Sequence, residues 1–148
     1  DFWTGARHEG GQSITLPAPL DGDPPLLARA GCAIALNLAE AHFGLDADAR
    51  GFQVFPLVEG SFEAECFEDD GLTQGYRRGE CGSWRLRICC AAEVLEVAVD
   101  RTGRRPPVDD RLALLLPGSE RRRVEVEGAS VVADAQKGPY RRLDLALR

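Results

Sequence analysis

The feature that most constrains the fold is a period of two in the side chains on both sides of a polar stretch. In residues 62–66 apolar side chains alternate with glutamates, and in residues 84–88 they alternate with arginines. Successive side chains of a strand point to opposite faces, so each run predicts a strand with one buried face. Between the runs, Asp70-Gly71 and further glycines indicate turns. We therefore predict consecutive antiparallel strands, with glutamates facing arginines on the solvent side.

The same signals recur along the rest of the chain. We predict further strands over residues 52–58, 94–99, 112–116, 123–127, 131–132 and 143–147, separated by turn residues. Pro56 is expected to mark a bulge or a sheet edge. Short strands at close intervals are typical of a β-sandwich, so the predicted fold class is all-β, an antiparallel sandwich over residues 51–148. The side chains expected to point into its core are Phe62, Trp84, Leu86, Ile88, Leu95, Val97, Leu114 and Leu145.

The first 50 residues have a different character. Residues 1–31 are rich in glycine and proline, which forbids a long helix and confines any strand to a short edge. We predict a strand over residues 29–36 and a short helix or loop over residues 39–44. Alanines and leucines in residues 26–43 also favour helix, so the two interpretations compete here.

Composition narrows the function classes. A net charge of −6 argues against nucleic acid or an anionic membrane as partner. No apolar run approaches the roughly 20 residues of a transmembrane helix. The five cysteines form no C-x-x-C pair and the two histidines lack ligand spacing. We therefore predict free thiols in a reducing, cytoplasmic compartment, with no metal or other cofactor.

Two stretches resemble a known family. The string FEAECFEDDG at residues 62–71, followed by Tyr76 and Gly79-Glu80, resembles the start of the distal C-terminal β-domain of family 31 glycoside hydrolases, the α-glucosidases and α-xylosidases. An earlier set is similar to the end of the proximal C-terminal domain of that family. It comprises DFWTG at residues 1–5, Gly10-Gly11, APLD at residues 18–21 and RAG at residues 29–31.

This resemblance implies a division of the chain and a role for it. Residues 1–50 would be the remnant of the proximal domain, a partial second β-domain, and residues 51–148 the distal sandwich. In the family a retaining mechanism uses two aspartates on a (β/α)₈ barrel. That barrel lies upstream of the matched region, so no catalytic residue can be assigned in this chain. The chain lacks methionine and starts at Asp1, so we expect a fragment or processed product.

Four residues are the candidates for a carbohydrate site, Asp69, Asp70, Tyr76 and Arg77. The two carboxylates suit either a structural turn or a cation or sugar contact, and they lack the spacing of a calcium loop. Tyr76 and Arg77 lie in a polar loop, whereas the phase of Trp84 assigns it to the core. Residues 120–123, Glu-Arg-Arg-Arg, are interpreted as a solvated turn.

The leading hypothesis is the non-catalytic C-terminal region of a retaining α-glycosidase, which supports a catalytic barrel in the same polypeptide. The alternative is a carbohydrate-binding β-sandwich module. On either hypothesis the chain alone would not be an enzyme. Because the apolar residues of the first 50 would lack their partners, we also expect self-association through that segment, or mobility of it.

Overall fold

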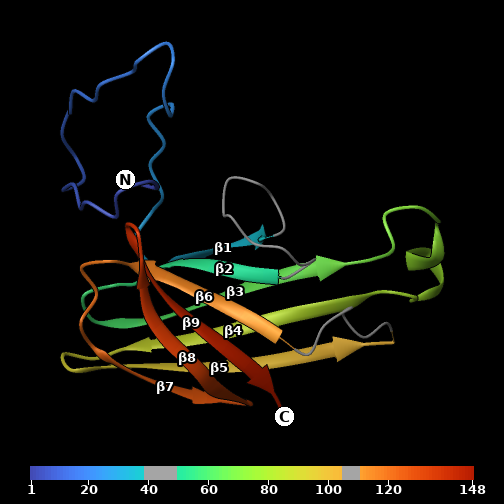
Figure 1. The fold of residues 1–148 in the computed structure, drawn as a ribbon. Helices are drawn as coiled ribbons and strands as arrows, with labels where there is room; N and C mark the ends of the chain where they lie inside the picture. Colours follow the sequence, from blue (N-terminus) through green and yellow to red (C-terminus); the bar gives the residue numbers. More distant parts are fainter. Residues whose placement is uncertain (39–49, 105–110) are drawn as a thin grey trace.

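The computed structural model describes residues 1–38, 50–104 and 111–148, and within them the chain forms two packed β-sheets (Figure 1). One sheet has five strands in the order β1-β2-β6-β9-β8. Its strands are β1 (Cys32–Asn37), β2 (Arg50–Phe55), β6 (Arg111–Pro117), β8 (Ala129–Lys137) and β9 (Tyr140–Leu147). The predicted all-β sandwich is thereby confirmed.

The second sheet has four strands in the order β3-β4-β5-β7. Its strands are β3 (Gly60–Glu68), β4 (Gly82–Cys90), β5 (Val94–Gly103) and β7 (Arg123–Glu127). One turn of 3₁₀-helix, η2 (Gly75–Arg78), lies in the long loop between β3 and β4.

The pairing departs from a purely antiparallel sandwich in two places. β2 pairs with β6 in parallel, and β5 pairs with β7 in parallel, while the other neighbours are antiparallel. Both parallel pairs join strands that are not consecutive in the chain. Local alternation carries no information about such long-range neighbours, so the sequence predicts the strands but not these two pairings.

The register of β3 against β4 places opposite charges side by side. Glu63 lies opposite Arg87, and Glu65 lies opposite Arg85, with 3.7 Å between the carboxylate and guanidinium of the second pair. Arg87 also pairs with Asp100 of β5 at 2.9 Å. The predicted acid–arginine pairing on the solvent face is confirmed.

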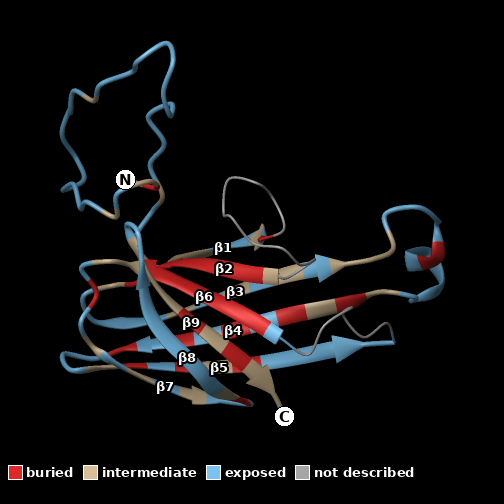
Figure 2. Cartoon of the chain, viewed as in Figure 1, coloured by how far each residue is buried: buried red, intermediate tan, exposed pale blue. Residues whose placement is uncertain are grey.

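The core lies between the two sheets (Figure 2). Of the eight side chains predicted to point inward, seven are buried and Phe62 is partly buried against the same cluster. Burial of a large apolar side chain contributes roughly 1.5–3 kcal/mol, so this cluster is the main source of stability. β2 is buried on both faces, as predicted for an inner strand, and it ends at Phe55 because Pro56 cannot donate to the ladder.

The first 31 residues, which we call the N-terminal arm, form no strand and no helix. The arm leads into β1, which begins three residues later than the predicted strand and pairs antiparallel with β2. The segment 1–50 therefore contributes an edge strand to the five-stranded sheet, while the division into domains at residue 50 stays a prediction. The helix or loop expected over residues 39–44 lies outside the described residues.

Candidate functional site

All four predicted site residues lie in one loop, the connection between β3 and β4. Asp69 and Asp70 follow β3 directly, and both carboxylates accept hydrogen bonds from the loop backbone. Oδ1 of Asp69 accepts from the N–H of Gly71 at 2.8 Å. Oδ1 of Asp70 accepts from the N–H groups of Leu72 and Thr73, at 3.1 and 2.9 Å, and its Oδ2 accepts from the Thr73 hydroxyl at 2.6 Å. These are the contacts of an Asx turn, in which a short carboxylate stands in for a backbone acceptor.

Tyr76 and Arg77 lie on η2, further along the same loop. The helix ends at Gly79, whose φ of 77° is the left-handed conformation that glycine adopts readily. The Tyr76 ring is exposed, and the Arg77 guanidinium lies 6.0 Å from the ring centroid. That distance is at the limit of a cation–π contact, so the contact of Arg77 with the exposed ring is weak.

The loop does not bring the four residues into one hollow. Asp69 and Asp70 border a shallow hollow at the end of the sandwich where β1, β2 and β3 meet, whereas Tyr76 and Arg77 are not among its lining residues. Phe67 also borders this hollow, and its side chain is 57% exposed. An exposed aromatic ring beside carboxylates is a combination that can contact a sugar, and sequence reasoning did not single out Phe67. The signal was present, because Phe67 breaks the run of polar residues on the outer face of β3.

The described residues hold no cluster of metal-ligating side chains. No group of three or more His, Cys, Asp or Glu side chains in residues 1–38, 50–104 and 111–148 is arranged to hold a metal ion. In the same residues, no helix has the length and apolar character to cross a membrane. Asp69 and Asp70 are neighbours on one turn, so their carboxylates do not flank a substrate as a glycosidase pair does.

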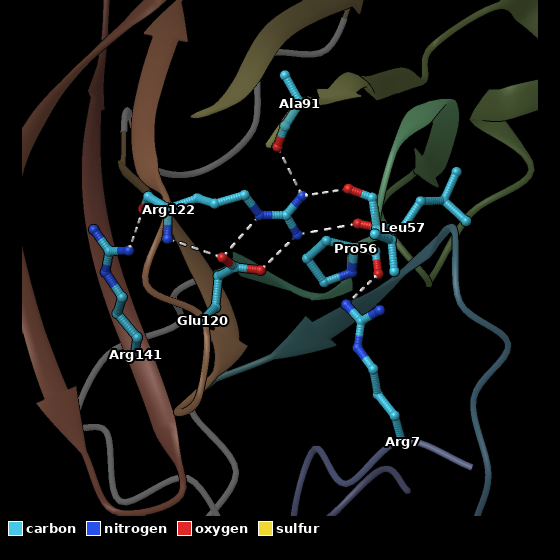
Figure 3. Close-up of polar contacts among 8 residues, drawn as sticks. Arg7, Pro56, Leu57, Ala91, Glu120, Arg122 and Arg141 are labelled. Atoms are coloured by element: carbon cyan, nitrogen blue, oxygen red, sulfur yellow. Dashed lines mark hydrogen bonds and ion pairs between the residues drawn. The ribbon is translucent and has the colours of Figure 1, made fainter. Parts of the chain in front are cut away.

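A buried polar cluster that sequence reasoning missed lies at the opposite end of the sandwich, where three loops meet (Figure 3). The Arg122 guanidinium donates to the carbonyls of Leu57 and Val58, both at 3.0 Å, and to the carbonyl of Ala91 at 3.2 Å. It also makes a two-pronged contact with Glu120, with Nε 2.9 Å from Oε1 and Nη2 2.7 Å from Oε2. All five N–H donors of the guanidinium thus have acceptors.

The environment of this cluster differs from that of the surface ion pairs. Side-chain exposure is 12% for Arg122 and 8% for Glu120. The hydrogen bonds from Arg122 hold the pKa of the Glu120 carboxyl below its ordinary value, against the opposing effect of burial. Arg141 continues the cluster, since its guanidinium donates to the carbonyl of Arg122 at 2.7 Å and pairs with Asp134.

The prediction of a solvated turn over residues 120–123 is therefore wrong. Glu120 is buried and Arg122 is half-buried, with only 12% of its side chain exposed, while Arg121 and Arg123 are exposed. Four consecutive charged residues usually indicate a surface, and nothing local distinguishes the second arginine from its neighbours. The acceptors that make its burial favourable come from two other loops, 31 or more residues distant in the chain.

The fold defines the class of the protein, an all-β sandwich, and the carboxylates at its two ends are engaged in turns and ion pairs. Comparison with known proteins then adds specific relatives. No known protein-family profile matches the chain. An α-xylosidase of Saccharolobus solfataricus is 35% identical over 85 residues, which is 54% of this chain and 11% of that protein. An α-glucosidase 2 of Bacillus thermoamyloliquefaciens is 30% identical over 80 residues, 54% of this chain and 10% of that protein.

These matches confirm the resemblance to α-xylosidases and α-glucosidases for about half of the chain. The matched stretch spans about a tenth of the length of these curated relatives. The similarity thus concerns a small part of much larger enzymes.

Proposed function

We propose that this chain is the non-catalytic C-terminal region of a retaining α-glycosidase of the α-glucosidase or α-xylosidase type, and that it supports the catalytic barrel of that enzyme. The observation that carries the proposal is the pair of matches to an α-xylosidase and an α-glucosidase, each confined to about a tenth of the relative.

The carboxylates of the chain support the non-catalytic part of the proposal. Retaining hydrolysis needs two carboxyl groups about 5 Å apart on opposite sides of a glycosidic bond. Asp69 and Asp70 are instead occupied by backbone N–H groups of their own loop. Glu120 is held by Arg122, and Asp134 by Arg141. These four carboxyl groups stabilise loops and ion pairs, which supports a structural role for them.

A further part of the proposal is a cytoplasmic location. All five cysteines are free thiols in the structure. Oxidising compartments favour disulfides, so a sandwich with five unpaired thiols suits a reducing one.

The test compares the 148-residue chain with the longer polypeptide that the proposal expects to contain it. We expect the longer polypeptide to contain a barrel with two suitably placed aspartates and to hydrolyse an aryl α-glucoside or α-xyloside. The 148-residue chain should show no hydrolysis above buffer. Turnover by the purified chain that is lost in Asp69→Asn or Asp70→Asn would contradict the non-catalytic role.

A second candidate, a carbohydrate-binding module, is favoured by one observation: exposed Phe67 borders the same hollow as Asp69 and Asp70. If the hollow binds sugar, maltose or xylose oligosaccharides should shift amide resonances of residues 67–70, and Phe67→Ala should abolish the shifts. Tyr76→Ala is the matched control, since Tyr76 is exposed on the same loop but does not line the hollow. Unchanged spectra at millimolar sugar would exclude this function.

A further inference from the structure

The ends of the N-terminal arm rest on two segments of the sandwich. The first segment is residues 55–58, the end of β2 and the loop that follows it. The N–H of Gly31 donates to the carbonyl of Phe55 at 2.8 Å, and the Arg7 guanidinium donates to the carbonyl of Pro56 at 3.0 Å. The start and the end of the arm thus meet at the same short loop.

The second segment is residues 117–120, the turn that follows β6. Gly5 lies against this turn, because a Cβ atom at Gly5 would come 2.8 Å from Cβ of Pro117. Gly31 lies equally close to the first segment, where a Cβ atom would come 2.9 Å from Cδ2 of Leu57. Cβ atoms essentially never come within 3.0 Å of a neighbour, so the arm approaches both segments more closely than a residue with a side chain could without displacing them.

The buried ion pair joins these same two segments. Arg122 donates to the carbonyls of Leu57 and Val58 in the first segment, both at 3.0 Å. Its partner Glu120 belongs to the second segment, and the N–H of Glu120 donates to the carbonyl of Pro117 at 2.8 Å. Figure 3 shows the guanidinium groups of Arg7 and Arg122 pointing at neighbouring carbonyls of the first segment. The two segments that carry the arm are therefore fixed to each other by one ion pair.

The attachment of the arm is concentrated at its ends. Phe2 is buried, with its ring 5.9 Å from that of Phe55, and its carbonyl accepts a 2.7 Å hydrogen bond from Gln53 of β2. Residues 8–25, by contrast, are exposed except for Leu16, and Figure 1 shows them as a loop that runs away from both sheets. A change in the two segments therefore acts on the few contacts that hold the arm in place.

The core of the sandwich is built separately from these contacts. Every buried member of the core cluster lies on a strand, and the cluster is closed by the two sheets themselves. Segments with few buried apolar contacts open at a lower free energy than the core does. The arm can thus leave the sandwich while the two sheets stay packed.

We propose that residues 55–58 and 117–120 form a latch for the N-terminal arm, and that the Arg122–Glu120 pair holds this latch in shape. When the pair is broken, the arm detaches and the sandwich stays folded. The arm is then a strap with an attached and a released position. This inference goes beyond the proposed function and is independent of it, because it concerns contacts within this chain.

Amide hydrogen exchange of Gly31 reports the detachment, because its N–H is bonded to the carbonyl of Phe55 on the latch. In Arg122→Lys the exchange rate of this amide should rise about tenfold or more, since an ammonium group cannot replace the charged hydrogen bonds of the guanidinium fork. The amides of β4 should stay protected, which shows that the sandwich is still folded.

Leu86→Ala is the matched control. It weakens the core, where Leu86 is fully buried, and does not touch the latch. This variant should raise the exchange rates of the β4 amides and change that of Gly31 by less than about threefold, because Gly31 exchanges through local detachment of the arm.

Two results would overturn the latch. One is an unchanged Gly31 amide in Arg122→Lys. The other is an equal rise in Leu86→Ala, because the arm would then follow the stability of the whole sandwich. If Arg122→Lys does not fold, Glu120→Gln takes its place, since it keeps the size of the side chain and removes its charge, and the same two results decide. None of them bears on the proposed function, which is tested on the longer polypeptide.

Discussion

The sandwich and the N-terminal arm both contain many apolar residues, but the sandwich buries them and the arm leaves most of them exposed. In the sandwich, leucines and valines of the two sheets bury one another, and the core cluster is closed. In the arm, leucines are just as frequent but most remain exposed, and only Phe2 enters a buried position. The difference shows that apolar content does not make a folded unit. Alternation along paired strands does, because it brings the apolar side chains of neighbouring strands to the side of the sheet that faces the core.

A second contrast, within the sandwich, concerns charge. The pair Arg85–Glu65 lies on the surface with both side chains about half exposed, whereas Arg122–Glu120 is nearly buried. An exposed pair gains little because water screens it, while a buried guanidinium with all its donors occupied is costly to disturb. The buried pair joins three loops, so it belongs to the framework of the sandwich.

The largest effect is expected when this framework is broken. Arg122→Ala removes the donors to the carbonyls of Leu57, Val58 and Ala91 and leaves Glu120 without its cation. We expect a loss of about 3–5 kcal/mol in the free energy of unfolding, measured by urea denaturation. Arg123→Ala is the neighbouring control, with an exposed side chain and a surface ion pair, and should stay within about 0.5 kcal/mol. Equal effects of the two variants would contradict the structural role of Arg122.

Truncation of a leucine should cost much more stability in the sandwich than in the arm. Leu86→Ala leaves a cavity in the core, where the side chain is fully buried, and should cost about 2–5 kcal/mol. Leu20→Ala changes a fully exposed side chain, so a change within about 0.5 kcal/mol is expected. Denaturation of both variants of the 148-residue chain gives the comparison. A large loss in Leu20→Ala would mean that the arm is packed in solution.

The pH dependence of stability should report on Glu120. Its pKa is lower in the folded chain than its ordinary value of 4.5, because Arg122 donates to the carboxylate. A carboxyl with a lowered folded pKa stabilises the fold above its unfolded pKa, and this contribution is lost as pH falls through the folded pKa. The stability difference between wild type and Glu120→Gln should thus be largest near neutral pH and shrink below pH 4.5. Urea denaturation near neutral pH and below pH 4.5 measures this difference. A difference that stays constant with pH would exclude a lowered pKa of Glu120 in the folded chain.

The smallest effect is expected in the loop between β3 and β4. Asp70→Ala removes the acceptor of two backbone N–H groups and the Thr73 hydroxyl, which should cost about 1 kcal/mol, as the loss of a cap does. Glu63→Ala, on the exposed face of β3, is a suitable control. A loop that is ordered only by bound sugar would show no loss in the absence of sugar.

Much of the fold could be predicted because its signals are local. The alternation of Phe62, Ala64 and Cys66 with two glutamates places β3 and its solvent face without reference to any other part of the chain. The same holds for Trp84, whose phase with Leu86 and Ile88 predicts its burial correctly. The turn at Asp69 and Asp70 is also a local signal, because aspartate before glycine commonly accepts hydrogen bonds from the backbone of a turn.

The features that escaped prediction depend on contacts between distant segments. Arg122 is buried because loops at residues 57–58 and 91 supply carbonyl acceptors, and a run of arginines does not reveal them. Gln53 is buried beneath the arm and donates to the carbonyl of Phe2. Nothing in the sequence around this glutamine predicts that a segment 51 residues away covers it. The pairing of β2 with β6 has the same origin, since nothing in either strand specifies a parallel neighbour.

Amide hydrogen exchange of the 148-residue chain tests the central claim most directly: the core of the sandwich is closed, and the middle of the arm has no support from it. We expect the central strands β4 and β6 to exchange only through global unfolding. Residues 8–25 should exchange at nearly the rate of an unfolded peptide, because their backbone N–H groups have no acceptor among the described residues. A monomeric chain in which residues 8–25 are as protected as β4 would contradict the account.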